Sequence, residues 1–146
     1  PAALAWRKTA RSAMRCGLLP LSQTAALIDG TIGYHDYEGV ALNFEERTRL
    51  TANLGTGNLL ILRNHGLIAC GRDCAEAFLY IYRLENACKM QIAALAGGLE
   101  NAGFISGTAL ETTRDILRAH PSIADGKLQW RAMRRRMDRI DPSYRD

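Results

Sequence analysis

Two short apolar runs near the middle of the chain set the pattern from which the rest of the fold is predicted. The runs 59–62 and 67–70 consist of aliphatic residues, alanine and cysteine, and the polar break Arg63-Asn64-His65-Gly66 separates them. Apolar runs of this length between turn-forming residues are typical of strands buried on both faces. Because Asn64 and Gly66 tolerate the positive φ angles of a tight reversal, the pattern predicts a β-hairpin with His65 at its tip.

Apolar positions at steps of three and four predict a long helix directly after the hairpin. Asp73 can cap this helix, with Glu76 as its partner in a capping box, and Gly97-Gly98 can end it. Its apolar face is broad enough to cover a sheet and consists of Ala77, Tyr80, Ile81, Leu84, Cys88, Ile92 and Leu95. We therefore expect the helix to pack on the hairpin.

Five further helices are predicted from apolar spacing and from capping residues. Their ranges are 2–16, 22–28, 43–54, 108–119 and 127–140. The inner face expected for the first consists of Trp6, Ala10, Ala13 and Met14. Capping boxes are expected at Asn43 with Glu46 and at Thr108 with Glu111, and Phe44 is expected to face inward.

A strand that opens into a polar loop is predicted over residues 31–39, because β-branched and aromatic residues precede several polar ones. The side chains capable of acid, base or ligand chemistry are Tyr34, His35, Asp36, Tyr37 and Glu38. The same residues would also suit an ordinary solvated loop. A turn histidine can likewise be a ligand, a proton carrier or simply solvated, so local pattern leaves both interpretations open.

Length and composition narrow the class of protein. With 146 residues, 47% of them apolar and 23% charged, the chain predicts a single globular domain, 1–146. Within it, 121–146 form a C-terminal amphipathic helix and tail. No apolar run reaches membrane-spanning length, and no charged region precedes an apolar core as in a secretory signal, so we expect a cytoplasmic protein without a membrane partner. The first residue is Pro1 rather than Met, which indicates a processed or trimmed N-terminus or a fragment.

The four cysteines show neither a Cys-x-x-Cys pair nor zinc-finger spacing. Cys70 falls in a predicted strand, whereas Cys74 and Cys88 fall in the long helix among apolar neighbours. Reduced, buried cysteines are the expectation for such a chain in the cytosol.

The last predicted helix carries arginines around an apolar stripe that contains Trp130. These are Arg131, Arg134, Arg135, Arg136 and Arg139. A basic face raises the hypothesis of nucleic-acid binding, but no aromatic residues are interleaved as a stacking platform. Charge runs are usually solvated faces, and packing against a neighbouring subunit is a further alternative. We therefore predict no nucleic-acid partner.

Several stretches, in the same order along the chain, together resemble the class II aldolase/adducin family. Leu62-Arg-Asn-His-Gly-Leu-Ile-Ala-Cys-Gly71 is similar to its hairpin. Other similar stretches, including those typical of the adducin-like branch, are 16–25, 34–39, 75–78, 82–96 and 138–146.

The resemblance implies a fold and a chemistry. The fold is an α/β domain with three layers, α/β/α, around a mostly antiparallel sheet, usually a homotetramer, with the N-terminal part of the domain missing here. The chemistry is that of aldehyde-lyases and epimerases acting on sugar phosphates or small hydroxy-carbonyl compounds. In the family, a His-x-His pair and a hairpin histidine hold zinc, which stabilises an enediolate, and a glutamate moves protons.

Residue by residue, the resemblance preserves only one zinc ligand, His65. Ala2 and Leu4 stand where the His-x-His pair is expected, and the phosphate loop and the glutamate would precede Pro1. The other polar candidates near the site are Asn64, Tyr34, His35, Asp36 and Tyr37, of which His35 would have to be recruited from its loop as a second ligand.

Two functions follow from the resemblance. The chain is either an aldolase-type enzyme, or the surviving piece of one, whose catalytic site is incomplete and would need a partner chain, or a non-catalytic adducin-like module for oligomerisation. In both cases self-association is expected.

Overall fold

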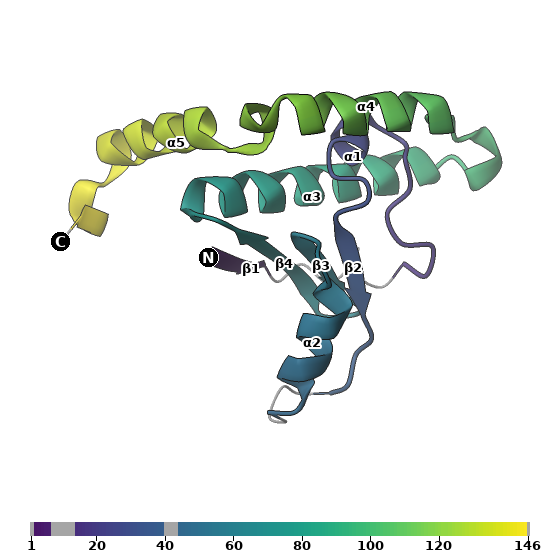
Figure 1. Ribbon diagram of the computed structural model, residues 1–146, viewed down its shortest axis with the longest axis horizontal. Helices are drawn as coiled ribbons and strands as arrows, with labels where there is room; N and C mark the ends of the chain where they lie inside the picture. Colours follow the sequence, from purple (N-terminus) through teal and green to yellow (C-terminus); the bar gives the residue numbers. More distant parts are fainter. Residues whose placement is uncertain (1, 7–13, 40–43, 146) are drawn as a thin grey trace.

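The computed structural model describes residues 2–6, 14–39 and 44–145. Its strands are β1 (Ala2–Trp6), β2 (Ile32–His35), β3 (Leu59–Leu62) and β4 (Gly66–Gly71). Its α-helices are α1 (Gln23–Ala26), α2 (Glu46–Leu54), α3 (Cys74–Leu95), α4 (Gly107–Ala119) and α5 (Lys127–Ile140). Three short 3-10 helices are η1 (Leu99–Asn101), η2 (Pro121–Ala124) and η3 (Pro142–Arg145). Figure 1 shows α3 across one side of the sheet and α2 on the other, with α5 packed on α3.

The four strands form a small mixed sheet in the order β1-β4-β3-β2. β4 pairs antiparallel with both β1 and β3, whereas β2 runs parallel to β3. The chain is thus an α/β protein with two antiparallel pairings and one parallel pairing among the described strands. The parallel pair has a consequence for function, because the C-terminal ends of β2 and β3 lie at the same edge.

The predicted hairpin is confirmed. β3 and β4 pair from Leu59 opposite Ala69 to Leu62 opposite Gly66, and Arg63, Asn64 and His65 form the turn. Asn64 has a φ of 58°, a left-handed conformation that asparagine tolerates better than most residues. Leu59, Ile61, Leu67 and Ala69 join the core under α3, and Leu60 is buried as well.

The prediction of a helix over 2–16 is wrong at its start. Residues 2–6 form β1, which pairs with β4 from Ala2 opposite Gly71 to Trp6 opposite Leu67, so Trp6 belongs to a strand and not to a helix face. The local sequence suits a helix, but β4 would otherwise present unpaired backbone groups, and pairing with β1 satisfies them. Residues 7–13, including Ala10 and Ala13, lie outside the described ranges, and Met14 is not helical.

The long helix α3 confirms its prediction in detail. The Asp73 side chain accepts a hydrogen bond from Glu76 N at 2.9 Å, and the Glu76 carboxylate accepts one from Arg72 N at 2.5 Å. The capping box therefore closes one residue earlier than in the standard motif. Most of the predicted apolar face is buried, but Ile92 is exposed.

The other predicted helices are present, but several begin or end at residues that differ from the prediction. α1 begins after Ser22, whose Oγ accepts from Ala25 N as expected, and α5 has the predicted bounds. α2 begins at Glu46 with no side-chain cap, and Asn43 lies outside the described residues. Phe44 is 76% exposed, so its predicted inward position is wrong: it precedes the helix and lies outside the core.

The cap predicted for α4 at Thr108 is also wrong. Ser106 caps this helix, with its Oγ accepting from Ala109 N at 3.3 Å, so Thr108 is already a helical residue. Serine and threonine are both preferred N-cap residues, so residue type alone does not distinguish Ser106 from Thr108.

The cysteines are reduced as expected, but they are not uniformly buried. Cys88 is buried and Cys70 half-buried, whereas Cys16 and Cys74 are exposed. Cys74 is the first residue of α3, where its side chain lies outside the helix–sheet contact. Among the described residues, no helix combines the length and the apolar character needed to cross a bilayer.

Candidate functional site

The polar loop after β2 and the turn after β3 meet at one edge of the sheet. His35 is the partner of Leu62 in the parallel register, so the residues that follow each strand are neighbours. Arg63 joins them: its N–H donates to His35 O at 2.9 Å, and its Nε lies 3.1 Å from Asp36 Oδ1. Its guanidinium also stacks on the ring of Tyr34, 5.2 Å from the centroid. The structure thus brings the two predicted polar segments together.

Within this edge, successive residues of β2 point to opposite faces of the sheet. Tyr34 faces the core, where its hydroxyl accepts a hydrogen bond from Leu18 N at 2.9 Å. His35 faces α2 and is 5% exposed, whereas Asp36 and Tyr37 are largely exposed. His35 is therefore the last residue of a strand and not a loop residue, and Asp36 and Tyr37 lie at the surface.

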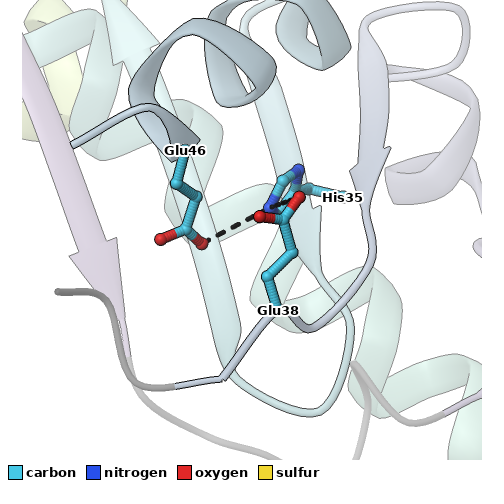
Figure 2. A group of neighbouring side chains, drawn as sticks. All are labelled: His35, Glu38 and Glu46. Atoms are coloured by element: carbon cyan, nitrogen blue, oxygen red, sulfur yellow. Dashed lines mark ion pairs between the residues drawn. The ribbon is translucent and has the colours of Figure 1, made fainter. Parts of the chain in front are cut away.

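His35 lies at the centre of a cluster of side chains between β2 and α2. Its Nδ1 is 2.8 Å from Asn53 Oδ1. Figure 2 shows its ring beside two carboxylates, with Nε2 3.4 Å from Glu46 Oε1 and 3.8 Å from Glu38 Oε1. Among the described residues, Nε2 is buried without a hydrogen-bond partner.

Arg49 on α2 fixes the second carboxylate of this cluster. Its Nε and Nη2 donate to Glu38 Oε1 and Oε2 at 2.8 and 2.5 Å. The hydrogen bonds from Arg49 lower the pKa of the Glu38 carboxyl below its ordinary value, and the positive charge of Arg49 acts in the same direction. Glu38 is therefore ionised at neutral pH.

His65 lies in the hairpin turn and is half-buried, with its N–H donating to Leu62 O at 3.1 Å. It does not join the cluster around His35: within the described ranges, the only convergent group of three or more His, Cys, Asp or Glu is His35 with Glu38 and Glu46. His35 therefore converges with two glutamates, in a group that does not include His65.

The strand register also separates His65 from the positions expected for the His-x-His pair. Ala2 and Leu4 pair with Gly71 and Ala69. At about 3.3 Å per residue, the partner of Leu4 lies about 13 Å along β4 from the turn. Neither side chain carries a ligand atom, so the residues present do not fit a zinc site of the expected type.

Sequence reasoning missed Glu46, Arg49 and Asn53 as site residues. They recur at steps of three and four on α2, so they share one helix face, and this face meets β2. Their spacing in the sequence predicts a shared polar face of the helix. Only the tertiary structure shows that this face of α2 contacts His35.

Comparison with protein families gives a match over most of the chain. The family described as Class II Aldolase and Adducin N-terminal domain matches residues 1–92. One relative is a Pseudomonas aeruginosa protein provisionally named as an aldolase class 2 protein. It is 44% identical over 138 residues, covering 92% of this chain and 52% of that protein. Rat alpha-adducin is 47% identical over 93 residues, covering 62% of this chain and 12% of that protein. The chain spans about half the length of the bacterial relative.

Solved structures show the same similarity in three dimensions. An aldolase II superfamily protein from Pseudomonas syringae superposes with a TM-score of 0.89 at 35% identity, over 99% of this chain and 59% of that one. L-fuculose 1-phosphate aldolase from Glaciozyma antarctica gives a TM-score of 0.62 at 23% identity, over 75% of this chain and 40% of that one, which shows a shared fold. With the fold, the hairpin and the family match in agreement, this chain belongs to the class II aldolase/adducin family.

Proposed function

We propose that this chain is a class II aldolase-type domain whose zinc site is incomplete, so that the chain alone neither cleaves nor epimerises sugar phosphates or small hydroxy-carbonyl compounds. The family includes metal-dependent aldolases. The observation that carries the proposal is that Ala2 and Leu4, which stand at the positions expected for the His-x-His pair, carry no metal-binding atom. The proposal gives the chain the three-layer α/β/α architecture of the family.

The physical reason is the number of ligands that a catalytic metal requires. A catalytic zinc ion keeps three protein ligands and one open position, through which it polarises a carbonyl and stabilises the enediolate. His65 offers one imidazole, and alanine and leucine offer no donor atoms. The hairpin thus keeps one ligand position, His65, but the other two ligands that a catalytic zinc ion needs are absent from the expected positions.

The activity of the purified chain tests this proposal. The chain is incubated with Zn²⁺ and a panel of ketose phosphates, and aldehyde release is followed by a coupled dehydrogenase assay. We expect release equal to that of the protein-free control. Release above this control that disappears in His65→Ala, but persists in the exposed-histidine control His120→Ala, would overturn the proposal.

A second candidate function, an adducin-like module that assembles with its own copies, rests on exposed apolar side chains of α5. Trp130 packs on Phe78 of α3, with ring centroids 5.7 Å apart, and thereby holds the helix against the domain. Leu128 and Ile140 remain 73% and 64% exposed. Apolar side chains left in solvent on an amphipathic helix favour contact with a further protein surface, and we propose a second copy, in a homotetramer, as the occupant.

Light scattering tests the assembly. We expect a mass several times that of one chain, and a lower mass for the double variant Leu128→Glu/Ile140→Glu than for the control Arg131→Glu/Arg135→Glu on the same helix. A monodisperse monomer for the unmodified chain would exclude the module.

A further inference from the structure

We propose that His35, Glu38 and Glu46 form a binding site for a divalent cation of the zinc class, between β2 and α2. The site shares no residue with the hairpin position of His65 and does not depend on the proposed function. One imidazole nitrogen and two carboxylate oxygens supply the ligands, and water can occupy the remaining position.

The spacing of the three ligand atoms fits a small coordination sphere. All three lie within 4.8 Å of one another. Bonds of about 2.0–2.2 Å from a tetrahedral zinc place any two ligand atoms about 3.3–3.6 Å apart. The separation of 3.4 Å between His35 Nε2 and Glu46 Oε1 falls in this range, and that of 3.8 Å to Glu38 Oε1 exceeds it by a few tenths. Glu38 is partly exposed and can make this adjustment.

The tautomer of His35 points Nε2 toward a cation. A carbonyl oxygen can only accept, so the neutral tautomer of His35 that hydrogen-bonds to Asn53 Oδ1, 2.8 Å away, is the one with its ring proton on Nδ1. The lone pair of a neutral ring then lies on Nε2, which is buried without a hydrogen-bond partner among the described residues. Metal-ligating histidines are held in the same way, by a second group that accepts from the nitrogen opposite the metal.

The charges around Nε2 favour a positive occupant. A lone pair that faces two carboxylates is repelled by both, and the ion pair of Arg49 is formed with Glu38. Either a proton on Nε2 or a cation between the three groups would relieve this repulsion. A protonated imidazole draws a carboxylate to about 2.7–2.9 Å, whereas neither oxygen here is closer than 3.4 Å. The separation matches ligands around an ion better than a direct ion pair.

The ligand types select the class of ion. Imidazole together with carboxylate suits zinc and its neighbours in the first transition row, whereas Ca²⁺ prefers six or more oxygens. Because Glu46 begins α2, Glu38 follows β2 and His35 ends β2, a bound ion would fasten the helix to the sheet. Binding should therefore raise the melting temperature.

Metal titration of the full chain tests the site. After removal of metal with a chelator, Zn²⁺ binding is measured by calorimetry, Co²⁺ by its visible absorption, and melting temperature by circular dichroism. We expect one equivalent of Zn²⁺ to bind and raise the melting temperature. Glu46→Gln keeps the shape of the side chain but loses its charge, and we expect it to weaken binding about tenfold or more.

Two matched variants complete the design. Glu111→Gln removes an exposed carboxylate on α4 and His65→Ala removes the hairpin imidazole, and we expect both to bind as the unmodified chain does. Circular dichroism verifies that each variant is folded, and Asn53→Leu, which releases the tautomer, provides a second test in case Glu46→Gln does not fold. No Zn²⁺ binding to the folded chain, or binding that survives both Glu46→Gln and Asn53→Leu, would overturn the proposal.

Discussion

Asn53 Oδ1 lies 2.8 Å from His35 Nδ1 and so joins the last turn of α2 to the end of β2. This hydrogen bond explains how a histidine can be almost entirely buried at the end of a strand. It also fixes the orientation of the ring, because in a neutral imidazole only the nitrogen that carries the proton can donate to a carbonyl oxygen.

Loss of this hydrogen bond should destabilise the fold. Asn53→Ala leaves a buried N–H of His35 without its acceptor, which costs about 1–3 kcal/mol of unfolding free energy. Urea unfolding followed by circular dichroism measures the change, and Asn86→Ala, an asparagine of α3 that bonds only to a carbonyl of its own helix, is the control. An equal effect in both variants would show that the link between α2 and β2 contributes little.

The same contact between α2 and β2 makes Gly33 sensitive to substitution. A Cβ at this position would lie 2.1 Å from the backbone oxygen of Asn53, which cannot move without shifting α2. Gly33→Ala should therefore lower the free energy of unfolding by about 1–3 kcal/mol or more, as overpacking does. Gly103→Ala meets no atom within 4 Å and is the matched control, so similar stability of the two variants would contradict this packing.

The hairpin turn depends on the left-handed conformation of Asn64. A β-branched residue at a φ of 58° is strained, so Asn64→Val should cost about 1–2 kcal/mol of unfolding free energy. Asn64→Gly should be tolerated, because glycine adopts this conformation freely. Thermal unfolding of the two variants measures the difference, and a valine variant as stable as the glycine variant would argue against the turn described.

The C-terminal turn should detach from α5 only in acid. Hydrogen bonds from Tyr144 and then Arg145 lower the pKa of Asp138 below its ordinary value of 3.8. A lowered pKa means that the contact is fully present above pH 3.8 and is lost as the pH falls through the lower, folded value. The NMR signals of the Tyr144 ring should therefore stay constant from neutral pH to 3.8 and shift below it. Asp138→Asn should remove this transition, and a shift above pH 5 would contradict the assignment.

The parts of the fold that the sequence predicts are those that local pattern decides. The hairpin around Asn64 and the helix α3 follow from apolar runs and from a cap at Asp73, all within a few residues of one another. β1 was missed because its conformation depends on the free edge of β4, more than sixty residues away. The cap at Ser106 is not predicted, because Ser106 and Thr108, two residues apart, are both side chains that can cap a helix.

In the candidate site too, local sequence predicts some features and others depend on tertiary contacts. His65 was identified from its turn, and the structure confirms its place at the tip of the hairpin. The grouping of His35 with Glu46 could not be predicted, because it depends on which face of α2 meets β2. Residues 34–37 share one loop in sequence, but strand alternation sends Tyr34 to the core and His35 to the opposite side.

The most direct test of this account is to observe which histidine binds metal. The chain has three histidines, His35, His65 and His120, and ¹⁵N-histidine NMR resolves the two ring nitrogens of each. On addition of one equivalent of Zn²⁺, we predict that His35 Nε2 shifts while its Nδ1 keeps the proton, and that His65 and His120 do not change. A shift at His65 with none at His35 would contradict both the cation site and the view that the hairpin position has lost its metal.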